Sequence, residues 1–341
     1  MLPATIIGMK IFIGPIIVSV IGLVAMYLWG GVAALILASI LAVLEVTLSF
    51  DNAVVNAKVL NEMEPIWQRR FITWGIWLSV FGTRLVLPIF IVALVSWVSP
   101  ITVTLLALYN PAEYSALLLG ADASIKAFGG AFLMMVSLKY FFDVGKRVHW
   151  FAPIEARLTR WGRVEAVEIA LAMIVLAAIS FLVHDDPTTV LRSGLIGLIL
   201  FTLTEGVAHG LGVEAKGATR TGAMLFVYLN LIDTAFSLDG VIGAFALTTS
   251  LPIIVVGLGI GAYFVRSLTL YLVYQHTLAS LKYLEHGAHW AIFGLAISMF
   301  AGLIIHVPEV VVAGVGLGFI ILSYMSSRRA LRGTEIAGEL G

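Results

Sequence analysis

The sequence predicts an all-α polytopic membrane protein with about ten transmembrane helices. Of its 341 residues, 60% are hydrophobic and only 12% are charged, and the mean hydropathy is +1.04. A soluble domain carries about 25% charged residues. Several apolar runs of about twenty residues follow one another, and each is long enough to cross the hydrocarbon core of a bilayer. Helices are expected because a backbone exposed to lipid must satisfy its own hydrogen bonds.

The apolar runs divide into ten expected spans. The first follows only Lys10 and lacks a small-residue cleavage site, which indicates a retained span and not a signal peptide. Segment 101–120 is also apolar, but Asn110, Pro111 and Glu113 interrupt it, so we expect a re-entrant or interfacial piece there. The expected spans are 11–29, 32–57, 71–98, 123–145, 166–183, 194–213, 222–248, 252–275, 287–306 and 309–326.

With ten spans, the basic residues outside the spans are distributed unequally over the two sides of the membrane. The side opposite the termini receives only Lys126 and Arg192. Because basic residues accumulate in cytoplasmic loops, we expect a multi-pass protein of the cell membrane with both termini in the cytoplasm. The side that holds the termini receives Lys10, Lys58, Arg69, Arg70, Lys146, Arg147, Arg157, Arg160, Arg163, Lys216, Arg220, Lys282, Arg328, Arg329 and Arg332.

Two polar stretches inside apolar spans indicate an internal repeat. "LEVTLSFDNAVVNA" (44–57) and "LIDTAFSLDGVIGA" (231–244) share an acid, then a serine four residues later and an aspartate six residues later. Each is followed by a span with one arginine, Arg84 or Arg266, and then by a Gly/Ala-rich span. Four expected spans lie between the two spans that contain these stretches, so the two spans cross the membrane in opposite directions, which predicts inverted repeats around a midplane site. The single membrane domain, 1–341, then comprises repeat 1 (32–145), a connecting two-helix segment (166–213), repeat 2 (222–306) and a last helix with a cytoplasmic tail (309–341).

Carboxylates within a membrane span need a functional or structural reason. An ionised side chain at the bilayer centre costs about 2.5–3.5 kcal/mol even on a lenient scale. On a straight helix Glu45 and Asp51 point about 120° apart and cannot hold one ion together. Ser49, Ser237 and Gly240 favour local unwinding, which lets oxygen atoms of the two stretches converge. Oxygen ligands without cysteine suit Mg²⁺, Ca²⁺ or Mn²⁺. The expected ligands are Glu45, Asp51, Asn52, Asp233 and Asp239.

Other polar residues leave more than one interpretation open. The buried acids could pair with arginines as links between helices, although such links do not require a repeated spacing with a serine in register. Lys139 could extend to the interface or pair with Asp143. Glu205 and His209 share a helix face and suit a second metal or proton-relay site, or a polar pair between helices. The residues expected to support or gate the site are Ser49, Ser237, Arg84, Arg266, Lys139, Glu205 and His209.

Two groups of polar residues are expected at the membrane interface. Asp143 and the neighbouring basic residues at a helix end are expected to meet lipid headgroups or water, since they follow an apolar span directly. The histidines near the ends of later spans are expected in the same environment. These residues are Asp143, Lys146, Arg147, His149, His276, His286, His289 and His306.

The two acidic stretches also carry a family resemblance. "EVTLSFDNAVVNAKVL" and "DTAFSLDG" resemble the paired signatures of TerC-like membrane proteins, within the broader LysE-type transporter group. The stretches "WQRRFITWGIWLSVFGTRL" and "FGGAFLMMVSLKYFFD" are similar to a bacterial branch of that group. The resemblance covers about residues 32–306. It implies an exporter of divalent metal, chiefly manganese, with the acidic motif positions at Glu45, Asp51, Asn52, Asp233 and Asp239. Gly240 departs from the family pattern, which usually has serine after the second aspartate.

The sequence therefore favours a secondary transporter that exports Mn²⁺ in exchange for H⁺ or Na⁺. The sequence has no nucleotide-binding motif, and we expect the protein to require no cofactor. The expected partners are a divalent metal ion and the lipid bilayer, with no nucleic acid. One alternative is a non-transporting scaffold that delivers metal to other membrane proteins or assists their insertion. Another is an exporter of small organic solutes. An intramembrane aspartyl protease is disfavoured because "FSLDG" lacks the Gly-x-Gly-Asp motif, so no enzyme is expected. The oligomeric state is left open.

Overall fold

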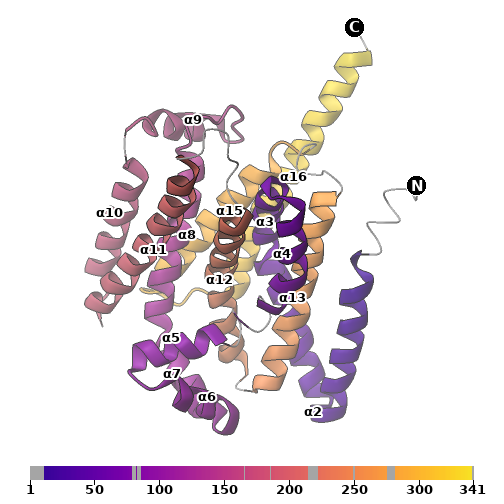
Figure 1. Cartoon of the computed structure of the whole chain (residues 1–341), viewed down its shortest axis with the longest axis vertical. Coiled ribbons are helices and arrows are strands. Elements are labelled where there is room, and N and C mark those ends of the chain that lie inside the picture. Colours follow the sequence, from indigo (N-terminus) through magenta and orange to yellow (C-terminus); the bar gives the residue numbers. More distant parts are fainter. Residues whose placement is uncertain are drawn as a thin grey trace.

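A computed structural model describes residues 11–78, 82, 86–164, 166–184, 186–213, 222–248, 250–274 and 281–339 (Figure 1). Within these ranges the regular elements are all helices. Four of them are long and apolar enough to cross a membrane, or five when the bent pair of α7 and α8 is taken as one span. The expected all-α membrane protein is therefore confirmed. The helices are α2 (Ile13–Leu48), α3 (Phe50–Glu62), α4 (Pro65–Trp77), α5 (Leu87–Ser96), α6 (Pro100–Tyr109), α7 (Pro111–Gly120), α8 (Asp122–Phe141), α9 (Ala152–Trp161), α10 (Val167–Leu182), α11 (Pro187–Val213), α12 (Gly222–Leu247), α13 (Leu251–Tyr274), α15 (Leu284–Ala301) and α16 (Glu309–Glu339).

Helix α2 consists of two arms that run in opposite directions. They are separated at Gly31, whose φ of +69° and ψ of −159° lie outside the helical region. Glycine adopts such a positive φ without the steric cost that a Cβ atom brings. The first arm runs antiparallel to α13 and the second runs parallel to it, with the turn between the first two expected spans. The contacts that establish these directions are Gly14 with Tyr263, Gly22 with Ile260, Gly257 with Leu41, and Gly261 with Glu45.

The local unwinding expected at both motifs is only a one-residue distortion in the first and is absent from the second. Ser49 has φ −100° and ψ 12°, yet its N–H still donates to the Glu45 carbonyl at 3.0 Å. Helix α12 continues through Ser237 and Gly240 without interruption. The expectation of a second broken helix is therefore wrong. The physical reason is that Gly240 serves close packing, because its missing side chain lets α12 approach Glu45.

Segment 101–120 is broken where its sequence predicts. Helix α6 ends at Tyr109, and the Asn110 side chain accepts a hydrogen bond from the backbone N–H of Glu113, which caps α7. Helix α7 then meets α8 at an angle of 52°. Helices α5, α6 and α7 gather at the lower end of the molecule, whereas α9 and the end of α16 lie at the upper end (Figure 1).

The core is built around α3, α8, α12 and α15. Helix α3 packs against α15, α12 packs against α8, and α8 and α15 pack against each other. At the last of these contacts Gly130 lies against Phe300. Helices α11 and α16 cover α8 and α15 respectively, and α13 covers both arms of α2. Within the two acidic motifs, on α2–α3 and on α12, these polar residues are buried: Glu45, Ser49, Asp51, Asn52, Asn56, Asp233 and Ser237.

Candidate functional site

The two acidic motifs meet through one side-chain hydrogen bond. Asn52 Nδ2, on α3, donates to Asp233 Oδ1, on α12, at 2.6 Å. Both residues are buried, with 1% and 5% of their surface exposed. The bond joins positions separated by 181 residues in sequence. The two stretches predicted to form one site are thus brought together at these two residues.

Three buried side-chain oxygen atoms of α3 and α12 are not hydrogen-bonded to any group in the part of the chain that the structure describes. They are Oδ1 of Asn52, Oδ2 of Asp233 and Oδ1 of Asn56. Asn56 follows Asn52 by four residues and therefore shares its helix face. A buried polar atom without a partner costs about 1–3 kcal/mol. All three atoms are acceptors, so a cation or a protonated donor would satisfy them.

Asn56 is a member of this group that the sequence prediction did not select. It is buried, at 2% exposure. The signal that could have identified it is its i,i+4 spacing from Asn52, which places both amides on one face of α3. The site thus gains an uncharged oxygen from the same helix as Asn52.

Glu45 lies beside the backbones of two helices and holds a serine of its own motif. Its Oε1 accepts a hydrogen bond from Ser49 Oγ at 2.7 Å. A Cβ atom at Gly240, on α12, would lie 3.2 Å from Glu45 Oε2, and one at Gly261, on α13, would lie 2.5 Å from Glu45 Cβ. The glycines therefore let both helices approach this buried carboxylate. Ser237, the equivalent of Ser49, is also buried.

The contacts of the two motifs are reciprocal. When the motifs are aligned, Glu45 corresponds to Asp233 and Asn52 corresponds to Gly240. Asn52 contacts Asp233, and Gly240 contacts Glu45. A residue of each motif therefore lies against the leading acid of the other motif, as two-fold related segments do.

Asp51 faces a different pair of helices. It lines a cavity of about 10 Å³ together with residues of α15 and α16, including Ala291, Leu295 and Gly316. Its Oδ1 also accepts a hydrogen bond from the backbone N–H of Asn52 at 2.8 Å. Glu45 and Asp51 thus point to different neighbours, as expected for a nearly straight helix. The cavity has room for about one water molecule.

Some of the residues expected to bind the metal or to support the site lie outside the described residues or side chains. This holds for Arg84, which falls in an undescribed range, and for the side chains of Asp239 and His209. Among the residues that are described, no three His, Asp or Glu side chains are close enough together to hold a metal ion. The three oxygens on Asn52, Asn56 and Asp233 come from two amides and one carboxylate, which is a donor set of a different composition.

A family model described as "Protein of unknown function (DUF475)" matches residues 50–334. The chain belongs to the DUF475 family. No curated protein and no solved structure matches it. The matched part of this DUF475 protein contains Asn52, Asn56 and Asp233 but begins after Glu45 and Ser49. The family description carries no substrate, so the chemistry of the site has to indicate one.

In this DUF475 protein Arg266 connects α13 to α4. Its Nη2 donates to the backbone carbonyl of Phe71, and its guanidinium carbon lies 3.4 Å from the centre of the Phe71 ring. Gly75 provides the space, because a Cβ atom there would overlap the guanidinium. Arg266 is buried, at 5% exposure. It therefore packs α13 and α4 together.

Lys139 lies beside two glutamates and not beside Asp143. Its Nζ is 3.7 Å from Glu168 Oε1 and 4.0 Å from Glu205 Oε1. Asp143 instead accepts a hydrogen bond from the backbone N–H of Gly145. Lys139, Glu168 and Glu205 line a cavity of about 520 Å³. Glu205 thus takes part in a charged cluster that includes Glu168, a residue the sequence prediction did not select.

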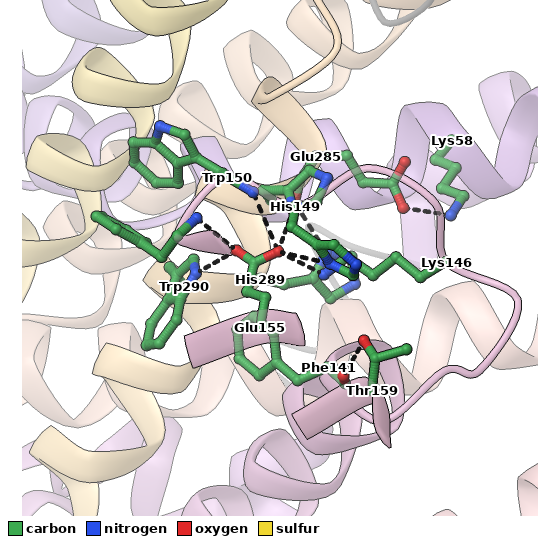
Figure 2. A network of polar contacts seen from close by, with 12 residues as sticks. Lys58, Phe141, Lys146, His149, Trp150, Glu155, Thr159, Glu285, His289 and Trp290 are labelled. Carbon is green, nitrogen blue, oxygen red and sulfur yellow. Dashed lines mark hydrogen bonds and ion pairs between the residues drawn. The ribbon is translucent and has the colours of Figure 1, made fainter. Parts of the chain in front are cut away.

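A second polar cluster, around Glu155 on α9, was not predicted from the sequence. Glu155 is completely buried. Its carboxylate lies 2.9 Å from Lys146 Nζ and accepts hydrogen bonds from His286 Nδ1 at 2.8 Å and Trp290 Nε1 at 3.0 Å. The backbone N–H groups of Trp150 and Phe151 also point to it. Figure 2 shows the carboxylate enclosed by these groups.

This cluster contradicts the expected exposure of Lys146, His286 and His289. The side chains of Lys146 and His286 are 6% and 4% exposed, because the segment after α8 folds back onto α15. His289 is buried as well and stacks on Tyr140 with ring centres 3.7 Å apart. Burial alone would raise the pKa of Glu155, but the hydrogen bonds from His286, Trp290 and Lys146 outweigh it and hold this pKa well below its usual range. Glu155 is therefore an ionised anchor for α9.

Proposed function

We propose that this DUF475 protein is a secondary transporter that exports a divalent cation, with Mn²⁺ as the leading substrate. The observation that carries the proposal is the group of three buried oxygens on Asn52, Asn56 and Asp233 that lack hydrogen-bond partners among the described residues. Carboxylate and amide oxygens are ligands that hard divalent cations prefer. A buried acceptor group inside a membrane protein is also a functional candidate by default. The resemblance to TerC-like exporters agrees with this substrate class.

The proposed architecture has ten spans and two inverted three-helix repeats, over 32–145 and 222–306. Reciprocal packing supports it, since α3 packs against α15 while α12 packs against α8. The contacts of Asn52 with Asp233 and of Gly240 with Glu45 are reciprocal in the same way, because equivalent residues each contact the leading acid of the other motif. Inverted repeats place a substrate site between equivalent helices near the midplane. The Asn52–Asp233 bond lies between two such helices.

The proposed orientation puts α9 and the end of α16 in the cytoplasm. Both elements lie at the same end of the molecule (Figure 1). Arg157 and Arg160 are on α9, and Arg328 and Arg329 are on α16. Concentration of basic residues at one end is what the positive-inside rule requires of a cytoplasmic face. The substrate would then enter from this end.

In the proposed cycle the buried acids alternate between cation and proton. Asp233 binds the cation together with Asn52 and Asn56, while Glu45 lies close by with its Ser49 hydrogen bond. Release to the outside leaves carboxylates that are uncompensated in a low-dielectric interior, and protonation removes that cost. Asp51 and Asp239, from the same motifs, are the next residues to test as ligands. This scheme accounts for cation export without ATP.

The test is Mn²⁺ flux into or out of liposomes that hold purified protein and a divalent-sensitive dye. We expect flux for the wild type and at least a tenfold loss for Asp233→Asn, which keeps the shape of the side chain but removes its charge. Glu113→Gln makes the same change at an exposed position and should leave flux unaltered. Mn²⁺ binding without flux under proton or sodium gradients would favour a metal-delivering scaffold. Absence of both binding and flux would overturn the proposal.

A further inference from the structure

The 520 Å³ cavity lies at the end of the molecule that carries α9. Besides α3, α8 and α12, its wall includes Val144 and Gly162, from the segments on either side of α9. Val55, Val59 and Leu225 form apolar parts of the wall, and Tyr140, Tyr228 and His289 form polar parts. It is therefore a mixed apolar and polar chamber on the side that we propose to be cytoplasmic.

The chamber lies directly along α3 from the Asn52 site. Val59 lines the chamber, and Asn52 precedes it by seven residues, which places the two on one helix face about 10 Å apart along the axis. Asn56 lies between them on the same helix. On α12, Tyr228 lines the chamber and Asp233 follows it by about 7 Å of helix rise. The chamber thus adjoins both helices that supply the buried oxygens.

Carboxylates outnumber amines among the described residues that line the chamber. Glu168, Glu205 and Asp143 line it as acids, and Lys139 lies among them as a base. Lys58, which also lines it, is paired with Glu285. A cleft lined by one sign of charge concentrates ions of the opposite sign.

Lys139 is held loosely between its two acids. Its separations of 3.7 Å and 4.0 Å from Glu168 and Glu205 exceed the 2.7–2.9 Å or so of a charge-assisted hydrogen bond. Its side chain is also 45% exposed. An exposed ion pair of this kind is worth only about 0–1 kcal/mol. A divalent cation, which carries twice the charge, can therefore displace the ammonium group.

From these observations we infer that the chamber is a cation entry site in which Lys139 occupies the Glu168–Glu205 pair until a hydrated divalent cation replaces its ammonium group. The inference rests on the proposed export function and adds to it the place where the substrate is first captured. The displaced Lys139 would extend to water at the mouth of the chamber. The captured cation would then lie about two helix turns from the Asn52 site.

The sequence contains no cysteine, so a single introduced thiol reports on the chamber without background. We would place Val59→Cys in the wall and Val54→Cys, a fully buried position of the same helix, as the matched control. Membrane-impermeant maleimide is added from either side of sealed vesicles. We expect Val59→Cys to react from the cytoplasmic side only and Val54→Cys not to react. Mn²⁺ should slow the reaction of Val59→Cys by at least fivefold.

Two further variants test the roles of the charged groups. Glu168→Gln in the Val59→Cys background should abolish protection by Mn²⁺, whereas Glu113→Gln, an exposed change of the same kind, should preserve it. Lys139→Met should lower the Mn²⁺ concentration needed for half protection by about threefold or more, because the competing ammonium group is gone. If half protection requires the same Mn²⁺ concentration with and without Lys139→Met, the proposed displacement of the Lys139 ammonium group is overturned.

Failure of this inference can be told apart from failure of the proposed function. If Val59→Cys reacts only after denaturation, or reacts without protection by Mn²⁺, the chamber is not a cation entry site, whatever the flux assay gives. If Mn²⁺ protects the thiol but no flux occurs in liposomes, the capture site stands and export is overturned. Full flux in Glu168→Gln would also overturn the entry role of the chamber.

Discussion

Gly240 approaches Glu45 so closely that a Cβ atom at position 240 would lie 3.2 Å from the carboxylate Oε2 of Glu45. The equivalent residue of the first motif, Asn52, donates a hydrogen bond to Asp233. The two halves of the site are thus unequal in chemistry although they correspond in position. One acid is held by an amide, and the other is held by its own serine, with a glycine facing it.

Enlarging Gly240 should displace the Glu45 carboxylate. Gly240→Leu is expected to reduce the free energy of unfolding by about 1–3 kcal/mol and to lower Mn²⁺ flux, because α12 can no longer lie against Glu45. Denaturant titration in detergent, followed by the flux assay, measures both effects. Gly314→Leu is the control, since a Cβ atom there would meet no atom within 4 Å. Equal behaviour of the two variants would mean that Glu45 has more space than the structure indicates.

Removing the Asn56 oxygen should separate binding from stability. In Asn56→Leu an apolar side chain of similar volume replaces a buried amide whose oxygen lacks a partner among the described residues. The free energy of unfolding of the variant is expected to equal that of the wild type or to exceed it by up to about 1 kcal/mol, because no unsatisfied acceptor remains. Mn²⁺ binding, measured by electron paramagnetic resonance, should weaken at least tenfold. A large loss of stability with unchanged binding would assign Asn56 to packing.

Neutralising Glu155 should release α9 from α15. Glu155→Gln leaves Lys146 buried without its counter-charge, and we expect a loss of about 3–5 kcal/mol. Faster hydrogen–deuterium exchange in residues 146–164 is the direct measurement. The exposed change Glu113→Gln is the control and should leave that exchange unaltered. Slow exchange in Glu155→Gln would show that apolar contacts alone hold the segment.

The same carboxylate predicts how stability depends on pH. Because the pKa of Glu155 is lower in the folded protein than its ordinary value of 4.5, its stabilisation is complete above about pH 4.5 and is lost as the pH falls through the lower folded value. Thermal unfolding of the wild type should therefore shift to lower temperature in acid. In Glu155→Gln the shift should be smaller. Parallel profiles for the two proteins would show that other acids dominate the acid response.

Gly31 should resist substitution for a conformational reason. Its φ of +69° with ψ of −159° is a backbone conformation that is essentially confined to glycine, and an L-residue there costs about 1–3 kcal/mol. Gly31→Ala is therefore expected to destabilise the protein by that amount, although a Cβ atom at Gly31 would meet nothing within 4 Å. Gly120→Ala, which is equally unobstructed and has no positive φ, is the control for denaturant unfolding. A neutral Gly31→Ala would indicate that the two arms of α2 can be joined differently.

The features that follow from local rules were predicted from the sequence. Apolar runs gave the helical membrane class, Asn110 marked the break between α6 and α7, and 100° of rotation per residue put Glu45 and Asp51 on different faces. Convergence of the two motifs was expected from their repeated spacing, and Asn52 and Asp233 do meet. These results depend on neighbouring residues or on a pattern that occurs twice.

The features that depend on distant partners were not predicted. Glu155 binds His286 and Trp290, which are 131 and 135 positions away, and no local pattern links them. Charged residues between spans resemble an interfacial loop in sequence even when tertiary contacts bury them. Continuity of α12 was also missed, because serine and glycine are compatible with both an unwound turn and a tightly packed helix. Packing against Glu45 decides between the two, and the sequence alone does not contain that contact.

The Glu155 cluster has a mechanical consequence. Helix α9 follows α8 along the chain and is attached to its end, because Thr159 Oγ1 donates a hydrogen bond to the Phe141 carbonyl. It is attached to α15 as well, through His286 and Trp290. Helix α9 therefore links the ends of α8 and α15. Sliding of α8 along α15 would require one of these two attachments to break, so this helix pair is least free to move at the end that carries α9.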